Sequence, residues 1–293
     1  NKPFPGDKGI YNICLNDDTA YLACGFGIVV LNINRKEISE TYYIGEGGTQ
    51  LKINEICLDG LNIYAATNQG IYYAALSSPN LIDYNAWTRD MSIPNYNLVF
   101  NTITYASGRI YANYSSGIGG GDIVYYQDDN TWIQFPQFNN NNCHQLTVWL
   151  DNIMVLSNFE VDVYDSNGNN LRHTFFGQPR TAARDDNGIL WVADGIGGLI
   201  RNKDDTPLLK LSPNGPGHNF VSSIKIKNNT LYAVPGGPDP DMGNLYRQAE
   251  VYTFKNNTWS NWSADSVRDF YKIAIDPMKA DHYFVSSWGY GLF

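Results

Sequence analysis

Short apolar segments separated by polar turns recur along the chain at a nearly constant interval. Each recurring unit begins with an apolar run, and one residue in that run can be matched from unit to unit. The seven matched positions are Ile13, Ile56, Ile103, Leu146, Ala183, Ile224 and Ile273. Their six intervals average about 43 residues, which is the length of one four-stranded blade of a β-propeller.

Each unit contains the same succession of four predicted strands. The second strand carries an aromatic residue near its start in every unit but the fourth, and these residues are Tyr21, Tyr64, Tyr111, Trp191, Tyr232 and Tyr283. A loop that usually contains glycine leads to an apolar third strand, and a more polar fourth strand, such as residues 38–43, ends the unit. The turn at residues 185–188, Asp-Asp-Asn-Gly, is the clearest hairpin signal, because these residues tolerate left-handed backbone.

The pattern predicts an all-β protein: a seven-bladed β-propeller with four-stranded antiparallel blades, the last of them incomplete. Neighbouring blades cover the middle strands of a blade on both faces, which explains why those strands are continuously apolar. A β-solenoid is the structural alternative, but its repeats would be shorter, and the hairpin turns imply antiparallel pairing. The expected blades of a single domain, 1–293, are residues 10–50, 51–98, 99–142, 143–178, 179–219, 220–267 and 268–293.

Three irregularities interrupt the repeat. The third unit has a glycine-rich insertion at residues 115–121, and the sixth has a long loop at residues 235–244. The seventh unit stops in its third strand at Phe293, so we expect an N-terminal fragment of a longer protein or a last blade that is left open. We interpret the oxygen-rich segment 165–169 as a hairpin turn.

Composition and charge exclude several classes of function. The 293 residues carry a formal net charge of −9, which argues against a broad surface for nucleic acid or for an anionic membrane. No apolar run approaches the roughly 18 residues of a membrane span. The four cysteines match no zinc-binding spacing, and we expect them to be small buried apolar residues.

The loops at one end of the predicted propeller form the candidate binding face. Loops between second and third strands open at the same end as the loops between blades, around the mouth of the central channel. Aromatic rings beside amide and guanidinium groups can stack on sugar rings and bind their hydroxyls, although some rings here would instead plug the channel. The candidate ligand-binding residues are Phe26, Gln69, His144, Arg180, His218, Arg268, Trp288 and Tyr290.

We find no catalytic motif and predict no catalytic residue, metal or cofactor. The four histidines are scattered, and no nucleophile elbow is present. The glycines at 117–121 lack the lysine and helix of a phosphate-binding loop. Asp239, Asp241 and Asn244 could supply oxygens to calcium, but their spacing does not match an EF-hand, and a solvated loop is the favoured interpretation.

One resemblance concerns the fifth unit. Residues 186–191 with Gly198 and Leu199 are similar to the propeller repeats of two-component regulators, which occur in periplasmic sensor regions of hybrid histidine kinases from Bacteroidetes. The other units carry Tyr in place of the Trp of that motif. This resemblance implies a periplasmic propeller that senses an oligosaccharide.

A second resemblance covers essentially the whole chain. Residues 21–30 through 41–45, residues 63–72 and residues 284–293 resemble, in order and spacing, the N-terminal propeller of PorZ-like proteins of the type IX secretion system. That family implies two propellers and a C-terminal β-sandwich, in the periplasm or at the outer-membrane surface. It also implies association with the sortase PorU and with anionic lipopolysaccharide, which the sortase attaches to secreted cargo, and no catalytic residue.

Three hypotheses about function follow. The first is a non-catalytic binding and scaffold module that resembles the first propeller of PorZ-like proteins. The second is the sensor propeller of a hybrid two-component system. The third is a propeller enzyme such as a lyase or hydrolase, which would require acidic residues and histidine to converge at the channel mouth.

Overall fold

The chain forms seven antiparallel β-sheets and no α-helix within the residues that the structure describes. The computed structural model describes residues 6–117, 120–138, 142–202, 208–211, 213–279 and 282–293. These residues form two compact units, an N-terminal unit (residues 1–211) and a C-terminal unit (residues 212–293). Parts of the glycine-rich insertion, residues 118–119, lie outside the described residues.

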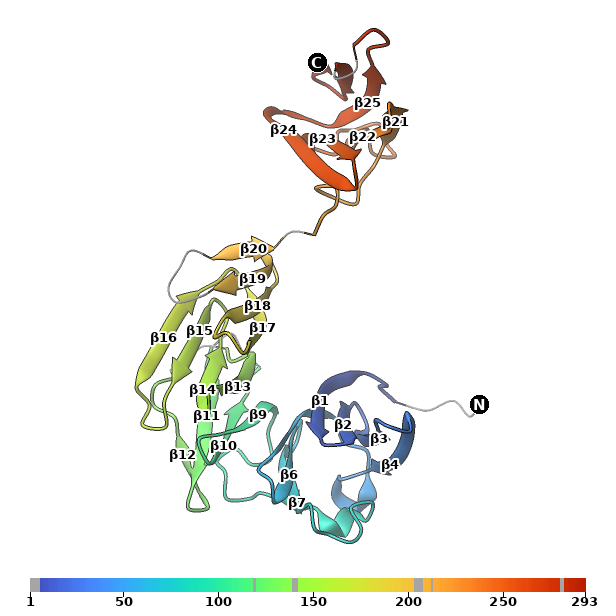
Figure 1. The fold of residues 1–293 in the computed structure, drawn as a ribbon. Coiled ribbons are helices and arrows are strands. Elements are labelled where there is room, and N and C mark those ends of the chain that lie inside the picture. Colours follow the sequence, from blue (N-terminus) through green and yellow to red (C-terminus); the bar gives the residue numbers. More distant parts are fainter. Residues whose placement is uncertain (1–5, 118–119, 139–141, 203–207, 212, 280–281) are drawn as a thin grey trace. The chain divides into compact units, whose positions relative to one another are not determined.

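The N-terminal unit contains five four-stranded sheets, and each is a simple meander (Figure 1). The first sheet consists of β1 (Ile10–Asn16), β2 (Thr19–Cys24), β3 (Gly27–Asn32) and β4 (Glu37–Tyr42). The second consists of β5 (Ile53–Leu58), β6 (Asn62–Thr67), β7 (Gly70–Ala75) and β8 (Thr88–Arg89), with short 3₁₀ helices η1 (Glu46–Gly48) before it and η2 (Tyr84–Ala86) before β8. The third consists of β9 (Phe100–Ala106), β10 (Arg109–Tyr114), β11 (Ile123–Asp128) and β12 (Thr131–Gln134). The fourth consists of β13 (Gln145–Trp149), β14 (Asn152–Leu156), β15 (Glu160–Tyr164) and β16 (Asn170–Phe175). The fifth consists of β17 (Pro179–Arg184), β18 (Leu190–Asp194), β19 (Gly198–Asn202) and β20 (Leu209–Leu211).

The C-terminal unit contains the last two sheets. The sixth sheet consists of β21 (Ser223–Lys227), β22 (Thr230–Val234), β23 (Gln248–Lys255) and β24 (Thr258–Arg268). The seventh has three strands, β25 (Phe270–Ile275), β26 (Tyr283–Ser287) and β27 (Gly291–Leu292). The predicted fold class is therefore confirmed: the sheets are antiparallel propeller blades, and the last one has three strands among the described residues.

Paired residues with positive φ form several of the hairpin turns. Asp129–Asn130, Asn228–Asn229 and Asn256–Asn257 each place two successive residues in left-handed backbone. This conformation matches the right-handed twist of the strands that the turn joins. The predicted turn at residues 165–169 is also present, since Asp165 Oδ1 accepts hydrogen bonds from the backbone N–H groups of Asn167 and Asn169.

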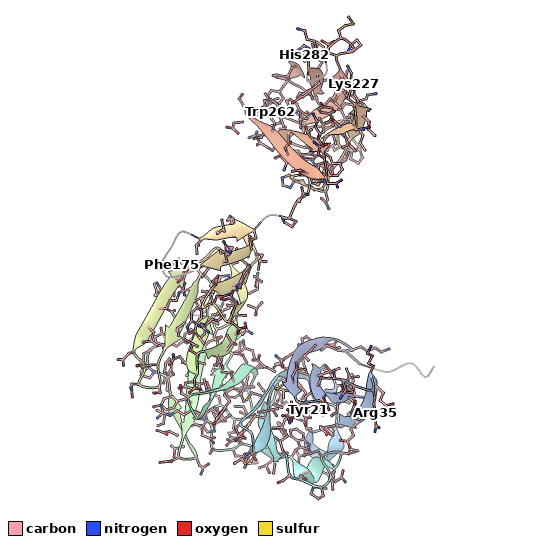
Figure 2. All side chains as sticks on the ribbon, in the orientation of Figure 1. Tyr21, Arg35, Phe175, Lys227, Trp262 and His282 are labelled. Carbon is pink, nitrogen blue, oxygen red and sulfur yellow. The ribbon has the colours of Figure 1, made fainter. Side chains whose placement is uncertain are left out.

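The core lies between neighbouring sheets rather than within any one of them. One apolar cluster joins the first and second sheets, and similar clusters join the second to the third, the third to the fourth, the fourth to the fifth and the sixth to the seventh. Ala23, Ala65 and Ala112 in the second strands are completely buried, and a side chain this small lets adjacent sheets approach closely. Phe175 and Trp262, on the outermost strands β16 and β24, are 62% and 52% exposed (Figure 2).

The first strands of neighbouring sheets are linked by side-chain hydrogen bonds as well. In the N-terminal unit, β1, β5, β9, β13 and β17 follow one another and each contacts the next (Figure 1). Asn54 Nδ2 donates to the carbonyl of Phe100 at 2.7 Å, and Asn101 Nδ2 donates to the carbonyl of Cys143 at 2.7 Å. These bonds fix the start of β5 against that of β9, and the start of β9 against the residues just before β13.

Cys24, Cys57 and Cys143 are buried, Cys14 is half-buried, and all four are free thiols. In the described part of the chain, no helix has both the length and the apolar character needed to cross a membrane.

The turn before β7 gives a stability prediction. Gly70 has φ +104° and packs so closely that a Cβ would lie 1.9 Å from the carbonyl oxygen of Tyr96, whereas Gly60 has φ +90° and open space around it. Gly60→Ala should lower the free energy of unfolding by about 1–2 kcal/mol through its left-handed backbone alone. Gly70→Ala should cost roughly 3 kcal/mol or more, because the backbone must also move. Urea unfolding of both variants measures the difference, and equal losses would contradict the close packing of Gly70 on Tyr96.

Candidate functional site

A polar cavity of about 280 Å³ lies along the first strands of the N-terminal unit. Two adjacent residues at the start of each of five sheets line it, in positions that correspond from sheet to sheet. These pairs are Tyr11 and Asn12, Asn54 and Glu55, Asn101 and Thr102, His144 and Gln145, and Arg180 and Thr181. The structure therefore brings together two of the predicted residues, His144 and Arg180.

A recurrent β-bulge shapes this cavity. In β1, β5, β9 and β17 the pairing with the second strand skips one residue, and the skipped residues are Tyr11, Asn54, Asn101 and Arg180. A bulge bends its strand and re-aims the side chain of the extra residue. One member of each lining pair in these four strands is such a residue, so the bulges bring a ring of polar side chains to the start of the sheets.

Glu55 is the central charged group of the cavity. Its carboxylate accepts hydrogen bonds from Asn12 Nδ2 at 3.1 Å, from the backbone N–H of Ile103 at 2.9 Å and from the hydroxyl of Thr102. The oxygen of that hydroxyl accepts the backbone N–H of Leu146 at 2.9 Å, so a chain of hydrogen bonds joins the first four sheets. Burial raises the pKa of Glu55 to about 7, and the hydrogen bonds from Thr102 and Ile103 offset only part of that effect.

Other groups in the cavity have unused hydrogen-bonding capacity. Gln145 Oε1 is a buried acceptor without a partner in the described residues. Arg180 is exposed, and within the described residues its side chain donates one hydrogen bond, from Nη2 to Gln178 Oε1 at 3.3 Å. His144 Nε2 lies 3.0 Å from Asn158 Oδ1. The cavity thus combines a cation, a carboxyl group and amides, which suits a polar ligand with several hydroxyl or anionic groups.

Two further predicted residues lie on loops of the N-terminal unit. Phe26, in the turn between β2 and β3, is half-buried, and its ring centroid lies 6.3 Å from that of Tyr43. Gln69, in the turn between β6 and β7, is exposed, and its backbone N–H donates to Thr67 Oγ1. Neither residue lines the polar cavity.

The remaining four predicted residues lie in the C-terminal unit. The guanidinium of Arg268 is held by Gln248 Oε1 and by the carbonyls of Asp265 and Val267, so its main contacts are structural.

The other three are partly exposed. Trp288 packs edge-on against Tyr271 and donates from Nε1 to the carbonyl of Met242. His218 Nε2 lies 4.0 Å from Glu250 Oε2, and Tyr290 is 48% exposed.

Buried aspartates hold the loops between second and third strands. Asp194 accepts backbone N–H groups of Gln178 and Ile196, and fully buried Asp269 accepts those of Tyr246 and Arg247. Burial raises the pKa of Asp194, but the hydrogen bonds from Gly197, Gln178 and Ile196 outweigh it and lower that pKa below its usual value. These carboxylates position loops and are not free to bind a ligand.

Two oxygen-rich groups have the composition of a metal site, but hydrogen bonds already occupy them. In the 235–244 loop, Asp239 Oδ1 accepts the backbone N–H groups of Asp241 and Gly243, which makes it part of a turn. Among the described residues, Glu160, Asp162 and His173 place potential ligand atoms within 4.8 Å of one another. Asp162 Oδ1 already lies 2.6 Å from His173 Nδ1 and accepts Asn170 Nδ2, so a hydrogen-bonded pair accounts for this arrangement.

Comparison with known families finds a match at the beginning of the chain. Residues 1–88 match the model of the N-terminal β-propeller domain of PorZ from the type IX secretion system (TSS9). The predicted resemblance is thereby confirmed over the first two sheets. No functionally curated protein matches the chain significantly.

Solved structures with the same fold extend the comparison to nearly the whole chain. PorZ of Porphyromonas gingivalis, described as an essential bacterial surface component of the type IX secretion system, is 20% identical with a TM-score of 0.68. The extracellular domain of a hybrid two-component system from B. thetaiotaomicron is 14% identical with a TM-score of 0.53, and YCF48 bound to D1 peptide is 12% identical with a TM-score of 0.50. At these identities the similarity shows the fold.

The matched regions differ in how much of each relative they represent. The alignments cover 97%, 95% and 96% of this chain, in the same order. The chain spans 38% of the PorZ chain, 44% of the two-component protein and 91% of YCF48. It thus corresponds to a little over one third of the PorZ structure.

The raised pKa of Glu55 gives a pH-dependent prediction. Between about pH 4.5 and 7 the folded state holds a proton on Glu55 that the unfolded state has lost, so this group makes stability fall as pH rises, by up to about 1.4 kcal/mol per pH unit. Glu55→Gln should remove that fall, whereas Glu37→Gln, on an exposed carboxylate of β4, should retain it. Chemical unfolding at several pH values measures the difference between variant and parent. Parallel curves for the parent and Glu55→Gln would contradict a protonated Glu55 near neutral pH.

Proposed function

We propose that this chain is a non-catalytic binding and scaffold propeller of the PorZ type, acting in the periplasm or at the outer-membrane surface. In this role it assists type IX secretion and the sortase-dependent attachment of cargo to anionic lipopolysaccharide. The observation that carries the proposal is the match of residues 1–88 to the PorZ N-terminal propeller domain. In this role residues 1–293 act as a single propeller domain.

The polar cavity supports a glycan as the ligand. Sugar hydroxyls both donate and accept hydrogen bonds, and the cavity offers an amide acceptor on Gln145 and a cation on Arg180. An acidic group on the lipopolysaccharide would pair with Arg180, since guanidinium binds carboxylate and phosphate through paired hydrogen bonds. Because the chain is acidic overall, with a net charge of −9, such local cations are needed to hold an anionic ligand.

A sensor propeller is the second candidate. Its support is the fold similarity to the extracellular domain of the B. thetaiotaomicron two-component protein. A sensor would recognise a free oligosaccharide rather than a lipid-linked one, so the two functions differ in the ligand that binds.

Binding of purified anionic lipopolysaccharide, measured by surface plasmon resonance, tests the proposal. Arg180→Ala should weaken binding by about tenfold, because it removes a charge-assisted contact. Trp288→Ala tests the predicted residues of the C-terminal unit in the same assay. Arg35→Ala is the matched control, since this exposed arginine lies in the β3–β4 turn, at the other end of its sheet from the β2–β3 turn (Figure 2). Unchanged binding in both Arg180→Ala and Trp288→Ala would exclude both the polar cavity and the predicted residues of the C-terminal unit, and binding of free oligosaccharide alone would favour the sensor.

A further inference from the structure

A second cavity, of about 310 Å³, lies at the outer edge of the second sheet. It is formed by the connection between β4 and β5, which includes η1, and by the segment around η2 and β8. β8 is the outermost strand of its sheet, whereas the polar cavity lies along the first strands. The two cavities share no lining residue.

Three aromatic side chains form one part of this outer cleft. Tyr84 is 40% exposed, whereas Tyr72 and Trp87 are 5% and 7% exposed and present only part of their rings. Trp87 is held by a hydrogen bond from Nε1 to the carbonyl of Leu81 at 3.0 Å and by a ring contact with Tyr42 at 6.0 Å. The cleft therefore combines two fixed rings with one accessible ring.

Turn geometry and a helix cap hold the backbone around the cleft in place. In η1, Gly47 and Gly48 have positive φ, and a Cβ on Gly48 would lie 3.3 Å from the ring of Tyr84. Glycine at position 48 thus lets that ring pack directly on the turn. Asp83 caps η2 by accepting the backbone N–H of Asn85 at 2.9 Å. A cleft whose backbone is fixed by its own contacts binds its ligand with less loss of conformational entropy.

The polar groups of the cleft carry both signs of charge. The guanidinium of Arg89 lies over Tyr72 and Tyr96, at 5.9 Å and 5.5 Å from the ring centroids, and only its Nε has a hydrogen-bond partner within the described ranges, the carbonyl of Tyr96. The exposed carboxylate of Glu46 has no ion-pair partner in the part of the chain that the structure describes. Asn85 donates through Nδ2 to Asp83, which leaves its Oδ1 as an acceptor.

We propose that this cleft binds a saccharide ring. A sugar ring presents apolar C–H faces to an aromatic side chain such as Tyr84, and its hydroxyls need donors and acceptors together, which Arg89, Glu46 and Asn85 provide. A phosphate-rich ligand would meet the like charge of Glu46 as well as Arg89, and a basic peptide would meet the like charge of Arg89 as well as Glu46, so a cleft with both charges favours neither over an uncharged ring. The cavity volume is at the lower end of the range for small-molecule sites, which fits one or two sugar rings.

The proposal is independent of the polar cavity and of lipopolysaccharide as its ligand. The outer cleft has other lining residues than the polar cavity, and it lies on a different part of the second sheet. A protein with both sites would hold a glycan chain at two points, which raises the overall affinity when both are occupied.

Binding of the protein to an array of neutral and uronic-acid-containing oligosaccharides, followed by calorimetry with the strongest of them, tests the outer cleft. Tyr84→Ala and Arg89→Gln should each weaken binding by about tenfold, and Tyr84→Phe should bind normally because it keeps the ring. Tyr105→Ala, which removes another exposed tyrosine that lines neither cavity, should change the affinity less than about twofold.

Tryptophan fluorescence gives a second readout. Saccharide binding should alter the emission of the parent protein and alter it much less in Trp87→Phe. Loss of binding in Arg180→Ala with normal binding in Tyr84→Ala and Arg89→Gln would overturn the outer cleft while supporting the polar cavity. Absence of binding to every oligosaccharide on the array, or preference for a peptide, would also overturn it.

Discussion

Each sheet of this protein has to bury both faces of its middle strands, and only a neighbouring sheet can cover them. In the second sheet, Ile63, Ala65 and Ala66 on β6 are completely buried. Ile63 and Ala65 belong to the cluster shared with the first sheet, whereas Ala66 belongs to the cluster shared with the third. Since alternate residues of a strand point to opposite faces, one strand contributes to two cores. No blade can therefore be stable alone, and the repeat is a requirement of packing.

The first strands face a different constraint, and the polar cavity is its consequence. They are the innermost strands, where the sheets come closest, and their polar residues are mostly committed to links between sheets. Asn54 and Asn101 bind backbone carbonyls of the next sheet, and Glu55 bonds to the first and third sheets. Arg180 and Gln145 retain unused capacity in the same ring. A site built this way has a rigid frame with few groups left to contact a ligand.

The strand order was predictable from the sequence because packing on both faces leaves a strong periodic signal. All seven matched positions, from Ile13 to Ile273, lie in the first strand of a sheet, and the aromatic positions lie in the second. The bulges were not predictable from the sequence. The extra residue of a bulge, such as Asn54 beside Glu55, cannot be distinguished there from a residue of a regular strand. Arg180 and His144 were identified only from their place at the loop end. The outer cleft was missed because residues 76–87 follow no repeat.

The two candidate sites differ in their charges, and this difference indicates which ligand each of them would bind. In the polar cavity the acidic group is Glu55, whose pKa lies near neutrality, so at neutral pH a substantial share of the molecules presents Arg180 without an opposing charge. Such a cavity can accept an anionic group, although the chain carries a net charge of −9. In the outer cleft Glu46 is exposed and faces the same cavity as Arg89, so the local charge is balanced. Such a balance favours an uncharged ring with several hydroxyls as the ligand, because this ring repels neither Glu46 nor Arg89.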